Sequence, residues 1–137
     1  MAGDSTLIRR ATAADLPAIG AIQGGSGWPP ESYLSYDCRV AIQNGCVAGF
    51  LVSREIAPGE REILNVVVDP ASRRRGIGKK LLEAEISGAR GNWYLEVRES
   101  NQAAIKLYES MGFRATGRRP DYYLDPPEMA IVMSFFS

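Results

Sequence analysis

The sequence predicts a mixed α/β fold (α+β-like) in which a single, largely antiparallel central sheet is flanked by helices. Segments with strand patterning alternate with amphipathic helical segments, and there are too few β–α crossovers for a doubly wound sheet. The 137 residues, 45% of them hydrophobic, suffice for one core. We therefore expect one domain over residues 1–137 with the element order β-α-α-β-β-β-α-β-α-β-β.

The first elements are a short strand and two helices. Residues 6–10 (TLIRR) have the composition of a strand, and Thr12 followed by Asp15 predicts the capped start of a helix. Gly24 ends that helix, and Pro30 opens a second, short one.

A hairpin is expected next. The Asn44-Gly45 dipeptide is typical of a two-residue turn, here between strands at residues 39–43 and 47–54. In this hairpin Cys46 lies opposite residue 43, far from Cys38, so we expect two reduced, buried cysteines.

The second half completes the sheet and its helices. A strand at residues 62–68 is the most apolar and is expected to be central and buried. The remaining elements are expected at residues 76–87 (helix), 92–97 (strand), 101–111 (helix capped by Asn101), and 113–117 and 130–135 (strands joined by a loop around Tyr122 and Tyr123).

Composition excludes several classes of function. The chain has no histidine, so it has no Ser-His-Asp triad, no Cys-His dyad and no histidine-ligated metal, and we expect no metal. Its 16 basic and 16 acidic residues balance, which argues against a protein that coats nucleic acid or a membrane. There is no apolar signal segment or membrane span, so we expect a cytoplasmic protein.

An arginine–glycine loop follows the apolar strand. Residues 66–82 read VVVDPASRRRGIGKKLL, with cations crowding the expected start of a helix. Cations there oppose the helix dipole unless an anion binds, and free backbone N–H groups make such an end a phosphate site. Two nucleotide-binding patterns fail, because Arg73 stands at a required glycine of one and Leu81 at a required glycine of the other. The alternative is a solvated basic surface.

The loop resembles the pyrophosphate-binding motif of the GNAT superfamily of acyl-CoA-dependent N-acetyltransferases, [RQ]-x-x-G-x-[GA]. Arg73, Gly76 and Gly78 occupy its defined positions. Residues 95–98 (LEVR) and 104–113 (AIKLYESMGF) are similar to the RimI-type branch, the ribosomal-protein N-terminal alanine acetyltransferases. The expected element order matches the GNAT fold over nearly the whole chain.

The resemblance implies an enzyme that transfers an acetyl group from acetyl-CoA to a primary amine, with a protein N-terminal α-amine as the acceptor. It implies Glu96 as general base, Tyr108 as general acid and Asn101 as a cofactor contact. The cofactor residues it implies are Val66, Val67 and Val68 along the strand and Arg73, Arg74, Arg75, Gly76, Ile77, Gly78 and Lys79 in the loop and helix.

Several assignments stay open. Strand alternation puts Glu96 opposite the face of Trp93, which suits either an exposed glutamate or a base, and Glu62 is a competing base. Candidate acceptor contacts are Trp28, Tyr122 and Tyr123. The link before the Trp93 strand and the loop after the two tyrosines are shorter than in typical members.

Other functions compete with the leading one. The acceptor is alternatively a small-molecule amine or a lysine, and the chain is alternatively a CoA-binding module without turnover. Nucleic-acid binding through Arg73–Arg75 is a further alternative. The sequence does not indicate an oligomeric state.

Overall fold

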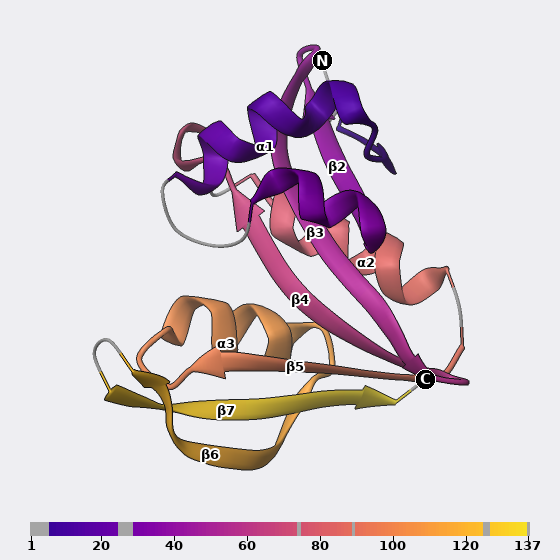
Figure 1. The fold of residues 1–137 in the computed structure, drawn as a ribbon. Helices are drawn as coiled ribbons and strands as arrows, with labels where there is room; N and C mark the ends of the chain where they lie inside the picture. The colour runs from indigo at the N-terminus through magenta and orange to yellow at the C-terminus, as the bar shows by residue number, and fades with distance from the viewer. Residues whose placement is uncertain (1–5, 25–28, 74, 89, 125–126, 137) are drawn as a thin grey trace. The chain divides into compact units, whose positions relative to one another are not determined.

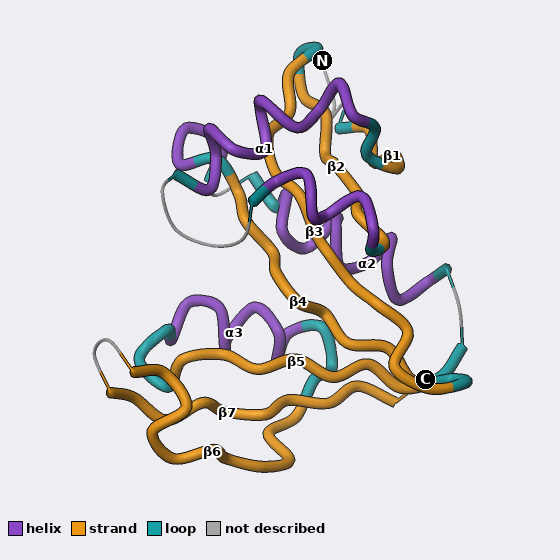
Figure 2. Tube along the Cα trace, in the orientation of Figure 1, coloured by secondary structure: helices purple, strands orange, loops and turns teal. Residues whose placement is uncertain are grey.

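The computed structural model arranges the strands in the hydrogen-bonded order β1-β2-β3-β4-β5-β7-β6 (Figure 1). It describes residues 6–24, 29–73, 75–88, 90–124 and 127–136, with the side chains of all these except 121–124 and 127. The elements are β1 (Leu7–Arg10), η1 (Ala13–Asp15), α1 (Leu16–Gln23), η2 (Pro30–Ser35), β2 (Asp37–Gln43), β3 (Cys46–Ala57), β4 (Glu60–Val68), η3 (Pro70–Ser72), α2 (Ile77–Ser87), β5 (Asn92–Arg98), α3 (Gln102–Ser110), β6 (Arg114–Leu124) and β7 (Pro127–Phe136) (Figure 2).

The predicted fold class is confirmed. β4 and β5 pair in parallel, whereas β1–β2, β2–β3, β5–β7 and β6–β7 pair antiparallel. The element order also follows the prediction, with η2, a 3₁₀ helix, as the second helix. Among the described residues, no helix is long and apolar enough to cross a membrane.

The chain divides into two compact units. The first unit comprises residues 1–54 and 64–88, and the second comprises residues 55–63 and 89–137. Strands β3 and β4 each contribute residues to both units.

The core of the first unit lies between α1, η2 and the strands β2 and β3. Tyr33 and Phe50 are buried with their ring centroids 5.6 Å apart, and the Tyr33 hydroxyl donates to Gln23 Oε1 at 2.7 Å. The buried members of this cluster are Ile19, Tyr33, Cys38, Val40, Phe50 and Val52. Burial raises the pKa of the Cys38 thiol to about 11.

Asp15 fixes the start of the first helical segment, as the capping pattern predicts. Its Oδ2 accepts from the backbone N–H of Thr12 at 2.8 Å, and both carboxylate oxygens accept from Arg9, at 2.8 and 2.9 Å. The Arg9 hydrogen bonds are the main reason that the pKa of Asp15 falls to about 2.

Helix α2 is held to the sheet of the first unit by a buried carboxylate. Glu85 is 3% exposed, and its two oxygens accept from Arg39 Nε at 3.1 Å and from the Ser53 hydroxyl at 3.0 Å. These donors lie on β2 and β3, so one glutamate joins three elements.

The core of the second unit is aromatic and places α3 on one face of β5 and β7. Trp93 and Phe135 are opposite one another in the β5–β7 register, and their side chains therefore share a face. The ring of Phe135 contacts that of Phe113, which in turn contacts Tyr108 of α3, with centroid distances of 5.5 and 5.8 Å.

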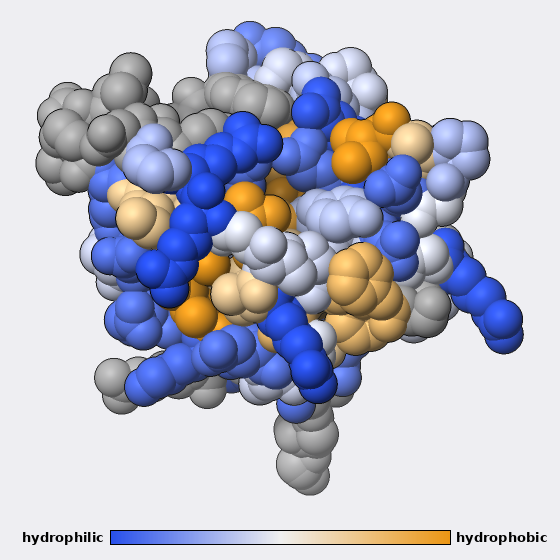
Figure 3. All heavy atoms as spheres, turned by 90° about the horizontal axis from the view of Figure 1, so that it is seen from below, coloured by the Kyte–Doolittle hydropathy of each residue, from blue (hydrophilic) through white to orange (hydrophobic). Residues whose placement is uncertain are grey.

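Polar and apolar side chains both lie at the surface of the second unit. Seen from the side on which β6 and β7 lie in Figure 1, hydrophilic side chains spread over the molecule with hydrophobic ones between them (Figure 3). Ile56 and Phe136 are exposed hydrophobic side chains of this unit.

Three local predictions need correction. Tyr122 and Tyr123 lie within β6 rather than in a loop, because this strand runs to Leu124 and Tyr123 pairs with Glu128 across the hairpin. Cys46 is exposed, since the turn leaves the first residue of β3 at the surface. Residues 66–68 are half-buried rather than buried.

Candidate active site

The arginine–glycine loop starts from an anchored strand end in the first unit. The Asp69 N–H donates to the Ala48 carbonyl at 2.8 Å, which fixes the end of β4 on β3. The Asp69 side chain then accepts from the Ala71 N–H at 3.2 Å and caps η3. The chain therefore enters the loop from a defined position.

Gly49 of β3 lets this strand lie close to the backbone of β4 and to the start of α2. A Cβ at this position would lie 2.9 Å from the Val67 carbonyl oxygen and 3.2 Å from Ile77 Cγ2. Val67 is on β4 and Ile77 begins α2, so Gly49 contacts both ends of the strand–loop–helix segment. The sequence analysis missed this glycine, because a lone strand glycine does not reveal which backbone it faces.

The N-terminus of α2 fits an anionic group. Gly76 takes a left-handed conformation (φ 72°), which glycine adopts without strain, and its carbonyl accepts from the Lys80 N–H at 3.0 Å. Among the described residues no side chain caps this helix and its first turn has no acidic residue. Its N–H groups therefore offer donors of the kind that bind phosphate groups.

The described cations at the start of α2 are exposed, and one of them is hydrogen-bonded to another element. Arg73, Arg75 and Lys79 are exposed, and Arg75 Nη1 donates to the Gln43 side chain at 3.3 Å. Arg75 is thus engaged by the β2–β3 hairpin. Arg74 lies outside the described residues.

The backbone of residues 66–68 is outside the β4–β5 ladder. The described ladder pairs residues 60–62 with residues 92–94, all of them in the second unit, whereas residues 66–68 belong to the first. This agrees with the half-burial of Val66, Val67 and Val68.

Glu96 lies in the second unit with its carboxylate only partly satisfied. The burial of β5 alternates, with Trp93, Leu95 and Val97 buried and Glu96 on the other face, as predicted. Glu96 Oε1 is 3.2 Å from Arg119 Nη2, whereas Oε2 is buried and has no hydrogen-bond partner among the described residues. A buried carboxylate oxygen without a donor is costly, and such a site favours a water or an amine.

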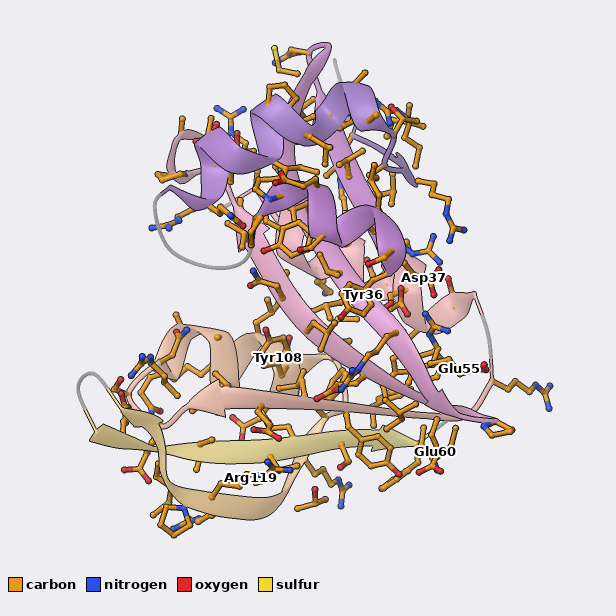
Figure 4. The ribbon with its side chains drawn as sticks, in the orientation of Figure 1. Tyr36, Asp37, Glu55, Glu60, Tyr108 and Arg119 are labelled. Atoms are coloured by element: carbon orange, nitrogen blue, oxygen red, sulfur yellow. The ribbon has the colours of Figure 1, made fainter. Side chains whose placement is uncertain are left out.

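Tyr108 belongs to the same unit, on the opposite face of the sheet. Tyr108 is 9% exposed. Its ring packs on Phe113, on the face of the sheet that carries Trp93. Figure 4 shows Tyr108 beside α3 and β5, and Arg119 beside β6 and β7. The structure thus places Glu96 and Tyr108 in one unit but on two faces of β5.

Asn101 is positioned by a network that the sequence analysis missed. Its Oδ1 accepts from the Ala104 N–H at 3.2 Å and caps α3, as predicted. The preceding turn is held by Glu128 of β7, whose carboxylate accepts from the Ser100 N–H and from Arg98. These donors, led by Ser100, lower the pKa of Glu128. No local pattern pairs Glu128 with this turn.

The other candidate residues have the following positions. Glu62 is half-buried on β4 and lies opposite Tyr94 in the parallel ladder. Trp28 and the side chains of Tyr122 and Tyr123 lie outside the described part of the structure. Residues 66–68 and the arginine–glycine loop belong to the first unit, and Glu62, Glu96, Asn101 and Tyr108 belong to the second.

A comparison with protein families identifies the chain. The model of the Acetyltransferase (GNAT) family matches residues 18–113, which is more than half of the sequence. The chain belongs to this family. The predicted GNAT fold and the predicted enzyme class, an acetyl-CoA-dependent N-acetyltransferase, are confirmed by this match and by the RimI-named relatives.

Individual GNAT relatives cover most of the chain. The ribosomal protein bS18-alanine N-acetyltransferase of Escherichia coli (strain K12) is 40% identical over 111 residues, which are 76% of this chain and 72% of that protein. The N-alpha-acetyltransferase RimI of Mycobacterium tuberculosis is 38% identical over 110 residues, 73% of this chain and 70% of that one. An uncharacterized Mycobacterium leprae protein matches at 38% identity, and there the matched residues are 31% of that protein's length.

A solved GNAT structure is similar to this chain in both fold and amino-acid sequence. The crystal structure of the ribosomal-protein-S18-alanine N-acetyltransferase from Escherichia coli superposes with a TM-score of 0.82 at 34% identity. The superposition covers 95% of this chain and 92% of that one.

Proposed function

We propose that the chain transfers the acetyl group of acetyl-CoA to the N-terminal α-amine of a ribosomal protein. The observation that carries this proposal is the 40% identity to the Escherichia coli bS18-alanine N-acetyltransferase over 72% of that enzyme. We further propose that residues 1–137 act as one acetyltransferase domain and that the enzyme works in the cytoplasm, where ribosomal proteins are made.

Acetyl-CoA supplies a thioester carbonyl and a thiolate leaving group. The N–H groups at the start of α2, with Arg73 and Lys79, are proposed to bind its phosphates, joined by Arg74, Arg75, Gly76, Ile77 and Gly78 of the same loop. The backbone of Val66–Val68 is proposed to bind the chain that leads to the thioester and to donate to its carbonyl oxygen as negative charge develops there. Asn101 is proposed as a further contact through its amide nitrogen.

Glu96 is proposed as the general base, with direct attack by the amine in a ternary complex. An α-amine has a pKa of about 8, so most of it is protonated at neutral pH and must lose a proton before it attacks. Glu96 Oε2, which has no hydrogen-bond partner among the described residues, is the atom proposed to take this proton, directly or through a water. Glu62 is the competing base, and its presence makes the Glu96 variant a decisive test.

Tyr108 is proposed as the general acid. The departing thiolate, with a pKa of about 8.5 if it resembles cysteine, accepts the proton of the Tyr108 hydroxyl. A ring packed against Phe113 with a hydroxyl directed to chemistry is an ordinary use of tyrosine.

The test is an acceptor panel assayed with acetyl-CoA and read by mass spectrometry. The panel holds a bS18 N-terminal peptide with a free alanine, the same peptide blocked at its N-terminus, a lysine peptide and small primary amines. We expect one acetyl group on the free peptide, located at the α-amine, and none on the blocked peptide. Acetylation of small amines or lysine with no free peptide modified would overturn the acceptor assignment, and cofactor binding without thiol release for any acceptor would favour a non-catalytic module.

A further inference from the structure

The Glu96 carboxylate is asymmetric in its surroundings. One oxygen lies 3.2 Å from Arg119 Nη2, and the other is buried without a hydrogen-bond partner among the described residues. The Glu96 side chain is 16% exposed, whereas that of Arg119 is 59% exposed. An exposed arginine contributes little to folding through such a pair, so the contact needs another explanation.

Arg119 reaches Glu96 from two strands away. Glu96 on β5 lies opposite Val132 on β7, and Arg119 on β6 lies opposite Ala130 on the same central strand. Ala130 and Val132 are two residues apart and share a face. Arg119 therefore crosses β7 on the face that carries Glu96.

A nearer arginine on this face is engaged elsewhere. Arg98 is two residues from Glu96 on β5 and therefore points to the same side. Its Nη1 donates to Glu128 Oε1 at 3.3 Å, and Glu128 lies on β7 two residues before Ala130. Arg98 is thus paired with Glu128, and the ion pair of Glu96 is made with Arg119.

We propose that Arg119 is a positioning residue for acetyl transfer, which acts by holding Glu96 Oε1 so that Oε2 is the proton-accepting atom. The inference rests on the proposed role of Glu96 as base. A guanidinium suits this task, because it stays charged and its donors are fixed in a plane. Without it the carboxylate turns freely about its last torsion, and misplacement of a catalytic group by about 1 Å can cost about 10²-fold in rate.

The test compares Arg119→Gln, Arg119→Lys and the matched control Arg118→Gln in steady-state assays with acetyl-CoA and the best acceptor of the panel. Arg118 is exposed and adjacent on β6, but it lies opposite Ile131 and so faces away from Glu96. We expect Arg119→Gln to lower kcat by about 10-fold to 100-fold. The KM for acetyl-CoA and the Tm should stay near wild type, Arg119→Lys should recover most of the rate, and Arg118→Gln should have no effect.

A double variant separates this inference from the function on which it rests. If Arg119 acts through Glu96, adding Arg119→Gln to Glu96→Gln should change kcat by less than about twofold, because effects on one unit do not add. Multiplicative losses, or a wild-type rate for Arg119→Gln, would overturn the positioning role while Glu96 stays the base. A wild-type rate for Glu96→Gln alone would overturn the base assignment and this inference with it.

Discussion

Two glutamates, the buried Glu85 of the first unit and the half-buried Glu96 of the second, differ in the partners of their carboxylate oxygens. Glu85 of the first unit is 2% exposed in its side chain, and each oxygen accepts from a donor, one from Arg39 and one from Ser53. Glu96 of the second unit has one oxygen beside Arg119 and the other buried without a hydrogen-bond donor in the described chain.

The difference in hydrogen bonding distinguishes a carboxylate that stabilises the fold from one proposed to take part in catalysis. Glu85 joins α2 to β2 and β3, and each of its two oxygens accepts a hydrogen bond in the folded state. Glu96 has one oxygen without a hydrogen-bond donor among the described side chains, which costs stability unless the oxygen has a further use. Substitution of the first should therefore change stability, and substitution of the second should change turnover.

The largest expected effect is on turnover. Glu96→Gln should lower kcat by about 10² or more, because the amide cannot take a proton, and Tyr108→Phe should lower it by a similar factor. The Tm of Glu96→Gln should stay within a few degrees of wild type. Steady-state kinetics with calorimetry provides the measurement, and losses within twofold for both variants would show that these residues do not perform the chemistry.

The converse experiment concerns Glu85. Glu85→Gln should lower the free energy of unfolding by about 2 kcal/mol, since it removes the charge of a buried carboxylate whose partner Arg39 is partly exposed. The kcat of the folded variant should be near wild type. Glu83→Gln is the matched control, because Glu83 is exposed on the same helix. Equal stability losses in the two variants, measured by urea unfolding, would contradict a structural role for Glu85.

Gly49 contributes to the first unit through close backbone packing and not through charge. Gly49→Ala should cost about 2 kcal/mol of stability, because the added Cβ would lie 2.9 Å from the Val67 carbonyl oxygen. It should also raise the KM for acetyl-CoA, since both Val67 and Ile77 would shift. In the control Gly117→Ala the Cβ meets Val132 at an ordinary 3.7 Å. A KM unchanged by Gly49→Ala would show that the loop adapts.

The smallest expected effect is the acid response of a second fully partnered carboxylate. The pKa of Asp15 is lowered to about 2, so its contribution is present above the unfolded pKa, near 4, and is lost as the pH falls toward 2. Because Arg9 is partly exposed, this contribution is about 1–2 kcal/mol. Unfolding measured from pH 5 to 2 should show a loss of that size that is absent in Asp15→Asn; equal losses in both proteins would rule it out.

Most of the fold follows from local sequence patterns. The Thr12–Asp15 capping box, the Asn44-Gly45 turn and the capping role of Asn101 appear in the structure as predicted, because each depends on residues a few positions apart. The extension of β6 through Tyr122 and Tyr123 was missed, since it depends on pairing with β7 across a break in register between Arg119 and Tyr123.

The candidate site divides in the same way. Strand alternation and a resemblance single out Glu96, and the cations beside Gly76 indicate an anion site, both by short-range patterns. These patterns do not predict which donor contacts Glu96, because Arg119 reaches it across an intervening strand. No spacing in the sequence encodes that contact.

By itself, then, the sequence determined the order of the elements, the zero net charge with its local excess of cations, and the family. It also determined the absence of histidine, so acid–base chemistry must use other groups. Only the tertiary structure decided that both oxygens of Glu85 accept hydrogen bonds, and that Glu96 Oε2 meets no donor in the part of the chain that the structure describes. The physical reason is that backbone periodicity is local, whereas the hydrogen bonds of a buried side chain depend on register and packing between distant segments.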